Sequence, residues 1–358
     1  MAGKYLSSEI SFGHVGLVEK ALFAKHLSVM LKSGIPITEA LEIASQSASG
    51  KLKFVLTDIL KAVSTGRAFS DALGDYPKIF GNLFFHSVYA GEKSGTLVEN
   101  LEYVSIQLEK EKDMVSKVRG ALFYPSIVFA AALVLGFGVA FFILPKITPI
   151  FEGLRVPLPV TTRALIYISH SFEDHGMAIF FITVGVLLGL VWLFRQRFVK
   201  PITHWVFLRS PIIKKIVLGS NIARFARTLG TLLKSGVGIE EALEITGGTL
   251  GNVYFKSSLI ASAKRVRTGE KLSGSLAQFK NLYPVIVTRM VRVGEESGNL
   301  DEALLYVADF YETEVDAATK TLSAAVEPAL LLFIGLVVGG LALSIITPMY
   351  EITGNIHR

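Results

Sequence analysis

Three long apolar segments dominate the hydropathy pattern of this 358-residue chain. They lie at residues 120–145, 176–194 and 328–350, and none of them contains a charged residue. Each reaches the length of about 18 apolar residues that a helix needs to cross the hydrocarbon core of a bilayer. The pattern therefore predicts three transmembrane helices rather than a signal peptide or the buried core of a soluble protein.

Outside these segments, apolar residues recur with the period of an amphipathic helix. The same stripe occurs twice, as Phe23, Leu27, Met30 and Leu31 and as Phe225, Leu229, Leu232 and Leu233. A lysine, a serine and a glycine follow each stripe, and the glycines are Gly34 and Gly236. A basic last turn followed by glycine is typical of a helix end, because glycine readily takes the left-handed conformation there. We expect one helix to end at each of these points.

The chain contains an internal repeat. Residues 23–43 match residues 225–245 without a gap, and residues 91–97 match residues 294–300. The match continues into the apolar segments, where Pro125 and Pro328 take the same place. The repeated unit is thus a helical domain plus the membrane span that follows it, and the middle span returns the chain for the second copy. Because no stretch alternates as a strand would, we predict an all-α integral membrane protein with two helical-bundle domains of roughly six helices each.

The repeat and the spans together predict the domain boundaries. In the first copy, further helices are expected at 51–64, 68–74, 79–92 and 97–118. The predicted order is a short N-terminal segment (1–16), helical domain 1 (17–119), span 1 (120–145), an outer loop (146–175), span 2 (176–194), a basic linker (195–218), helical domain 2 (219–327), span 3 (328–350) and an outer tail (351–358).

The distribution of charge predicts the topology. The composition is 51% apolar and only 18% charged, against about 25% charged in soluble proteins. The formal charge of +6 comes from residues 195–218, which hold six basic and no acidic residues. A basic flank next to a span faces the cytoplasm. Both helical domains and the N-terminus are therefore predicted to be cytoplasmic and the C-terminus extracytoplasmic, and nucleic-acid binding is the weaker explanation of the charge.

Both copies contain the phrase Gly-Glu-x-Ser-Gly-x-Leu. In the first copy it begins at Gly91 and is followed by Thr96 and Glu99, and in the second it begins at Gly294 and is followed by Asn299 and Glu302. Thr or Asn with Glu three residues later predicts a capping box at the start of a helix. The phrase lacks the lysine of a phosphate-binding loop and the spacing of a nucleophile elbow. We interpret it as an elbow between two helices, a role that is compatible with contact to a partner.

Few other positions suggest chemistry. Glu92 and Glu295 are weak candidates for a metal site or an ion-pair network, and Glu327 at the start of the third span is either functional or a carboxylate at the membrane interface. Gly136, Gly138, Gly339 and Gly340 would permit close contacts between spans. The cluster of His170, Glu173, Asp174 and His175 is better explained by an amphipathic segment at the membrane surface than by a metal. The chain has no cysteine and no legible active site, so no cofactor and no catalytic residue is predicted.

The stretches LLKSGVGIEEALEI, VRVGEESGNLDEAL and VEPALLLFIGLVVGGLALSIITPMY resemble the type II secretion system F family, the GspF/PilC platform proteins. The resemblance runs from about residue 17 to 350. The family's motif positions that match are Gly34, Gly91, Glu92, Ser94, Gly95, Pro125, Gly236, Gly294, Glu295, Glu296, Ser297, Gly298, Glu327 and Pro328. The chain departs from the pattern at Lys93, which stands where the second copy has Glu296, and in a shorter N-terminal segment than many members have.

The resemblance implies a non-enzymatic protein of the bacterial inner membrane that forms a homo-oligomer. Its expected partners are a cytoplasmic assembly ATPase, pilin or pseudopilin subunits, other inner-membrane assembly proteins and lipid. A small membrane transporter or permease subunit is the alternative function, and a membrane-bound enzyme is a third. Against a transporter, three spans are few and more than half of the chain is predicted to be cytoplasmic.

Overall fold

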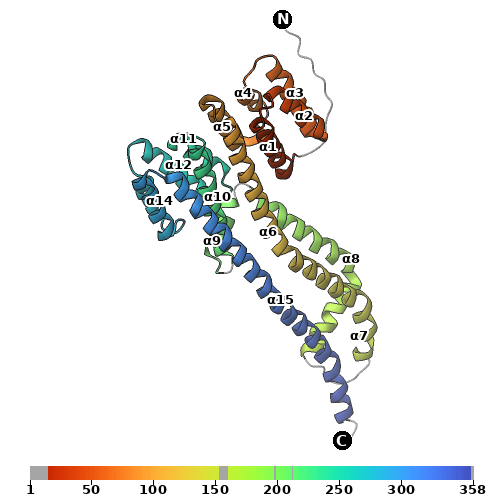
Figure 1. Cartoon of the computed structure of the whole chain (residues 1–358). Helices are drawn as coiled ribbons and strands as arrows, with labels where there is room; N and C mark the ends of the chain where they lie inside the picture. Colours follow the sequence, from red (N-terminus) through yellow and green to blue (C-terminus); the bar gives the residue numbers. More distant parts are fainter. Residues whose placement is uncertain (1–14, 153–159, 197–198, 212, 356–358) are drawn as a thin grey trace. The chain divides into compact units, whose positions relative to one another are not determined.

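The computed structural model describes residues 15–152, 160–196, 199–211 and 213–355. Within these residues every regular element is a helix, so the prediction of an all-α fold is confirmed. The helices of the first repeat, the central segment and the second repeat follow one another along the chain (Figure 1). They are α1 (Leu17–Lys32), α2 (Ile37–Ser47), α3 (Gly50–Ser64), α4 (Phe69–Gly74), α5 (Pro77–Ser94), α6 (Leu97–Gly138), the π-helical turn η1 (Val139–Ile143), α7 (Leu144–Glu152), α8 (Val160–Arg195), α9 (Lys200–Arg209), α10 (Lys214–Lys234), α11 (Ile239–Thr249), α12 (Val253–Arg267), α13 (Leu272–Ala277), α14 (Val285–Ser297) and α15 (Leu300–Asn355).

The chain divides into two compact units. The first unit comprises the described residues of Met1–Ser116 and His204–Asp316, and so contains most of both helical repeats. The second comprises the described residues of Lys117–Thr203 and Ala317–Arg358. Helices α6 and α15 are long enough to contribute residues to both units.

The first repeat packs six helices, α1 to the start of α6, around one apolar core. Its centre holds Leu27, Leu41, Leu56 and Phe84, all of which are almost fully buried. Phe23 stacks against Phe84 with ring centroids 6.1 Å apart. The predicted stripe on α1 thus faces the core, with Phe23 and Leu27 buried and the last two members partly buried.

The second repeat builds the equivalent core from α10 to the start of α15. Phe225, Leu229 and Leu232 of the predicted stripe are completely buried. The ring of Tyr283 lies edge-on against Phe225 and Phe255, and its hydroxyl pairs with Ser258 at 2.8 Å. The cluster also includes Leu83, which belongs to α5 of the first repeat. The two repeats therefore share a packed junction within the first unit.

The basic segment at 195–218 is largely helical rather than an extended linker. Helix α9 lies within it and Leu208 packs against the core of the second repeat. The backbone amide of Val253 donates a hydrogen bond to Nδ1 of His204, 3.2 Å away. These contacts attach α9 to the start of α12.

Among the described residues, three helices are long and apolar enough to cross a membrane, and their apolar parts lie in the second unit. Their side chains project outward, as Val134, Leu188 and Leu336 show with exposed fractions of 71%, 65% and 67%. Only lipid or another apolar partner makes such a surface stable. Phe137 and Phe141 of the α6–η1 segment meet Phe172 of α8 edge-on, with ring centroids 5.8 and 5.5 Å apart.

The structure differs from the sequence prediction in the connections of these spans. The helix expected at 97–118 does not end before the first span, because α6 runs on through Pro125 without a break. The proposed outer loop at 146–175 is mostly helical on either side of residues 153–159, which lie outside the described part of the chain. Helix α8 departs from helical geometry at His175, where φ is −133°.

The four glycines named as possible contact points between spans face no neighbouring atoms in the described part of the structure. A Cβ atom at Gly136, Gly138, Gly339 or Gly340 would meet open space. The close approach occurs at Gly176 instead, where the ring of Phe141 fills the space that a side chain would need. Glycine frequency in a span therefore did not identify the packing position.

Candidate functional site

The repeated phrase forms a tight elbow in each copy, between α5 and α6 and between α14 and α15. Gly95 and Gly298 end the first helix of each elbow in the left-handed conformation, with φ of 75° and 78°. The same conformation, expected at Gly34 and Gly236, is present there with φ of 84° and 85°. Glycine is favoured at such positions because a Cβ atom makes a positive φ strained.

At the first elbow, the bonds of Thr96 differ from those of the predicted capping box. The backbone amide of Thr96 donates to the carbonyl of Gly91 at 2.9 Å, which is the closing bond of a Schellman motif. The amide that a capping box offers to Glu99 is therefore already satisfied. The hydroxyl of Thr96 pairs instead with Ser94 Oγ, 2.7 Å away.

The first glycine of each phrase allows the two helices of the elbow to touch. A Cβ atom on Gly91 would lie 2.9 Å from Cα of Leu97, and one on Gly294 would lie 2.9 Å from Cα of Leu300. Both distances are shorter than a carbon–carbon contact of about 3.5 Å. Any larger residue would push the start of α6 or α15 away.

The glutamates of the two phrases bind the start of a neighbouring helix. The carboxylate of Glu92 accepts hydrogen bonds from the backbone amides of Phe69 and Ser70, at 2.7 and 2.9 Å. In the second copy, Glu295 accepts from the amides of Leu272 and Ser273 at 2.5 and 3.1 Å. These amides are the unpaired donors at the N-termini of α4 and α13, where the helix dipole also favours a negative charge. Each glutamate thereby fixes a six-residue helix against its elbow.

The serines make only local bonds. Ser94 Oγ donates to the carbonyl of Ala90 at 2.8 Å, and Ser297 Oγ donates to that of Gly294 at 3.4 Å. The intervening residue differs between copies, since Lys93 lies over the ring of Tyr89 whereas Glu296 faces Lys271 at 4.0 Å. The two elbows thus share their backbone conformation and glutamate bonds, and they differ in the charge of the exposed residue.

The structure also brings the first elbow against the second repeat. Asn100, one turn into α6, donates to the carbonyl of Ser235 at 3.2 Å and to that of Ser87 at 2.9 Å. Ser235 directly precedes Gly236, so two of the motif regions become neighbours. Pro125 lies within α6, Pro328 lies within α15, and the side chain of Glu327 lies outside the described part of the structure.

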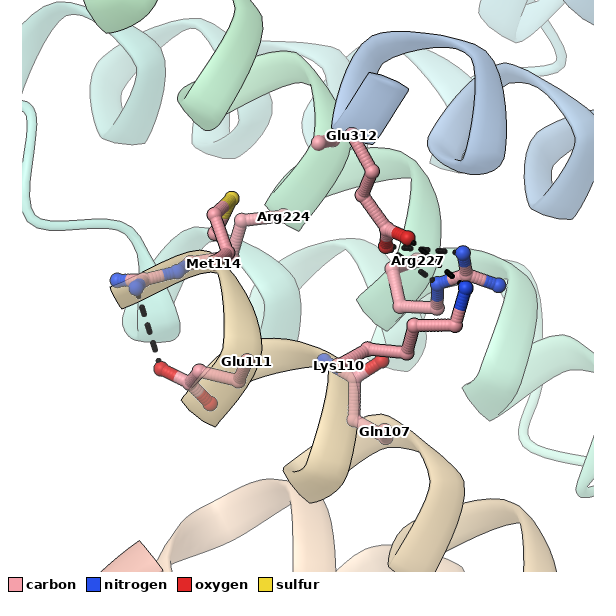
Figure 2. Close-up of a pocket in the computed structure, with 8 residues that line it drawn as sticks. Gln107, Lys110, Glu111, Met114, Arg224, Arg227 and Glu312 are labelled. Carbon is pink, nitrogen blue, oxygen red and sulfur yellow. Dashed lines mark hydrogen bonds and ion pairs between the residues drawn. The ribbon is translucent and has the colours of Figure 1, made fainter. Parts of the chain in front are cut away.

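Farther along α6, a cluster of charged side chains joins the two repeats (Figure 2). Lys110 Nζ lies 3.1 Å from Asp309 and 3.2 Å from Glu312, both on α15. Arg227 of α10 pairs with the same two carboxylates, at 2.8 Å in the case of Glu312. On the other side of the cluster, Arg224 pairs with Glu111 at 3.2 Å.

Electrostatics favour the charged forms of Lys110 and Asp309. Burial lowers the pKa of Lys110, but its hydrogen bonds to Asp309 and Glu312 outweigh that effect and raise the pKa overall. Burial likewise raises the pKa of Asp309, but hydrogen bonds from Arg227 and Lys110 lower it below its ordinary value. The side chain of Arg227 is only 8% exposed, and these carboxylates compensate its buried charge.

The two repeats match one known family. Residues 23–145 and residues 225–348 each match the sequence profile described as type II secretion system (T2SS), protein F. The chain belongs to the type II secretion system protein F family. The double match coincides with the internal repeat, so each copy of the F-family segment contains one elbow and one apolar span.

Individual relatives of this F-family chain cover nearly its whole length. It is 36% identical to "Type IV pilus assembly protein PilC" of Thermus thermophilus, over 99% of this chain and 88% of the relative. It is 35% identical to the protein of the same name in Myxococcus xanthus, over 97% and 83%. It is 31% identical to "Type II secretion system protein F" of Aeromonas hydrophila, over 95% and 87%. With its three apolar helices, it is a multi-pass membrane protein.

The glutamates named as metal candidates are engaged by other bonds in this F-family chain. In the described ranges, no group of three histidine, cysteine, aspartate or glutamate side chains is arranged to hold a metal ion. Both oxygens of Glu92 and both oxygens of Glu295 are engaged by backbone amides. Their position at the elbow has a structural explanation that sequence reasoning did not supply.

Sequence reasoning also missed the charged junction of the repeats. One signal was available, because the repeat aligns Arg227 with Lys25 and Glu312 with Glu109. Lys25 and Glu109 form the corresponding ion pair at 3.2 Å. A basic residue in the first helix and an acidic residue in the sixth, present in both copies, indicated an ion pair in each.

Proposed function

We propose that this protein is the inner-membrane platform of a machine that assembles type IV pili or the pseudopili of type II secretion. The observation that carries the proposal is its family membership, together with relatives of both names that it matches over more than nine-tenths of its length. In this role the chain performs no catalytic step itself. A cytoplasmic assembly ATPase hydrolyses ATP, and the platform transmits the resulting movement to pilin or pseudopilin subunits in the bilayer.

The continuity of two helices supports such a transmission. Helices α6 and α15 each begin at an elbow and continue as helix into an apolar span. A movement imposed on the α4–α5 or α13–α14 side of an elbow would be passed to the start of that long helix. The contacts of Glu92 and Glu295 make this link rigid, because they join the preceding short helix to the elbow.

The orientation that this role requires agrees with the charge distribution. The six basic residues of 195–218 support a cytoplasmic position for that segment, and with it for both repeats. Reporter fusions near residue 60 and near residue 260 should both be active only as cytoplasmic reporters. Fusions that report opposite faces of the membrane would exclude the topology.

Co-purification tests the partner directly. The full-length protein, extracted from its native membrane in mild detergent, should retain the assembly ATPase encoded in the same organism. A charge-reversed variant such as Glu296→Lys, whose side chain is 58% exposed, should retain less ATPase if the elbow is part of the contact. Solute uptake by proteoliposomes that hold the purified protein, without any retained ATPase, would favour a transporter instead.

A further inference from the structure

The junction between the repeats pairs two unlike faces. The α5–α6 face of the first repeat is formed by Leu83, His86, Tyr103, Gln107 and Lys110. The α10–α15 face of the second repeat is formed by Arg227, Thr228, Thr231, Lys234 and Glu312, together with Glu241 of α11. His86 Nδ1 lies 2.8 Å from Glu241, and Lys234 Nζ lies 5.1 Å from the ring centroid of Tyr103. Figure 2 shows the centre of this junction, where Lys110 reaches Glu312 beside Arg227.

Each repeat carries both kinds of face, because the two repeats share one sequence pattern. The counterpart of the α5–α6 face is the α14–α15 face of the second repeat, formed by Ile286, Arg289, Val293, Tyr306 and Phe310. The counterpart of the α10–α15 face is the α1–α6 face of the first repeat, formed by Lys25, His26, Val29, Lys32 and Glu109, together with Glu39 of α2. One chain can pair only one face of each kind within itself, so these two counterparts stay unpaired.

Exposure distinguishes the paired faces from their counterparts. Leu83 is 9% exposed in the junction, whereas Ile286, at the same place in the second repeat, is 52% exposed. Thr231 is 4% exposed, whereas its counterpart Val29 is 56% exposed. Exposed apolar side chains at positions that are buried in the other copy indicate a surface without its partner.

The space between the helices shows the same contrast. Beside Arg227 and Glu312 the packed junction leaves a cavity of about 10 Å³. The groove on the α1–α6 face beside Lys25 and Glu109 has a volume of about 180 Å³. The first repeat therefore presents an open groove where the second repeat is filled by α6.

The two unpaired faces are chemically complementary. The pair His86–Glu241 corresponds to Arg289 and Glu39, which are exposed and of opposite charge. The pair Tyr103–Lys234 corresponds to Tyr306 and Lys32, which repeat the aromatic and basic partners. Phe310 on one face and Val29 on the other add apolar surface, with exposed fractions of 46% and 56%.

We propose that the α14–α15 face of one copy of this protein packs on the α1–α6 face of a second copy, in the manner in which the first repeat packs on the second. The occupant of the open groove is thus another copy of the same chain. Because the two faces differ, the contact is head-to-tail, and its repetition generates a ring or an open chain of copies. This inference does not depend on the proposed function.

Cysteine cross-linking tests the proposal, since the natural chain contains no cysteine. One chain would carry Glu39→Cys and a second, differently tagged chain would carry Arg289→Cys, and both would be co-expressed and treated in membranes with a short bismaleimide. A cross-linked dimer that contains both tags is expected when the two variants are combined. Each variant alone should give little dimer, because a head-to-tail contact does not bring two copies of one face together.

A matched pair controls for random collision. Lys53 is also exposed but lies on α3, outside both faces, so Lys53→Cys combined with Arg289→Cys should cross-link no better than either variant alone. As a positive control, His86→Cys with Glu241→Cys in one chain should react within that chain. The proposal is overturned if the mixed dimer is missing while this control reacts, or if single variants dimerise as well as the mixture.

A second measurement separates the contact from folding. Ile286→Ser should weaken association between copies about tenfold or more in detergent, because the burial of an isoleucine is lost. Val285→Ser is the control, since Val285 is 66% exposed and its counterpart Asn82 is exposed in the junction. Equal association of both variants, each with an unchanged helical spectrum, would contradict the assignment of this face.

Discussion

Arg227 on α10 and Glu312 on α15 form an ion pair at 2.8 Å that α6 of the first repeat covers. Their counterparts Lys25 and Glu109 form a pair at 3.2 Å whose side chains are 54% and 43% exposed. The same ion pair thus occurs once largely buried and once exposed to solvent. The difference provides an internal comparison of what burial does to an ion pair.

Replacement of the two basic residues should have unequal effects on stability. Arg227→Met leaves Glu312 with Lys110 as its remaining partner. We therefore expect the free energy of unfolding to fall by about 1–3 kcal/mol, which is less than for a fully isolated buried charge. Lys25→Met removes an exposed pair, which is worth at most about 1 kcal/mol. Thermal unfolding of both variants in the same detergent measures the difference. Equal melting temperatures would show that the junction does not shield Arg227.

The pH dependence of stability should report the state of Asp309. Its pKa is lower in the folded protein than its ordinary value, despite partial burial, because Arg227 and Lys110 bind the carboxylate. A depressed folded pKa gives stability that is present above the unfolded value of about 3.9 and is lost as pH falls through the folded value. The stability difference between the natural protein and Asp309→Asn should therefore shrink as the pH falls from about 5 through the unfolded value of about 3.9 and below. A constant difference over this range would contradict the assignment.

The first glycine of each phrase should not tolerate even a methyl group. Gly91→Ala and Gly294→Ala place a Cβ atom 2.9 Å from the next helix, and overpacking of this kind costs about 1–3 kcal/mol. Gly248→Ala is the matched control, because it lies within helix α11 and its Cβ atom meets open space. The control should be neutral or more stable by up to about 1 kcal/mol. This explanation would be contradicted if the melting temperatures of the elbow variants fell no further than that of the control.

The elbow glutamates should act through their charge as well as their shape. Glu92→Gln keeps one oxygen acceptor for the two amides at the start of α4 and loses the charge at the helix N-terminus. We expect this change to lower the free energy of unfolding by about 0.5–2 kcal/mol. Glu295→Gln should behave alike at α13. Glu99→Gln, which alters a carboxylate in the same region without these bonds, serves as the control. Hydrogen exchange at Phe69 and Ser70 should accelerate in Glu92→Gln alone, and unchanged exchange would refute the role.

Local features of the sequence predicted the helices and their ends well. The positive φ at Gly34 and Gly95 follows from glycine at the end of a periodic apolar stripe, and the position of the elbow follows from the repeated phrase. The repeat also predicted that Phe23 and Phe225 occupy equivalent core positions. These properties depend on neighbours within a few turns, which the order of residues specifies directly.

The contacts between distant elements did not follow from the sequence. The sequence predicted a helix at 79–92 but not that Leu83 enters the core of the other repeat. It also gave no partner for Glu92, because the amides of Phe69 and Ser70 become available only where α4 begins. At the first elbow the predicted capping box is replaced by the Schellman bond of Thr96, which uses the same amide.

An in-frame deletion of the gene, complemented with the natural chain, tests the central claim most directly. The account predicts that the deletion abolishes surface pili or secretion of folded exoproteins while pilin or pseudopilin accumulates in the membrane, and that the natural chain restores assembly. Normal assembly in the deletion strain, measured by fibre counts and secreted protein, would contradict the assignment of this chain as the platform.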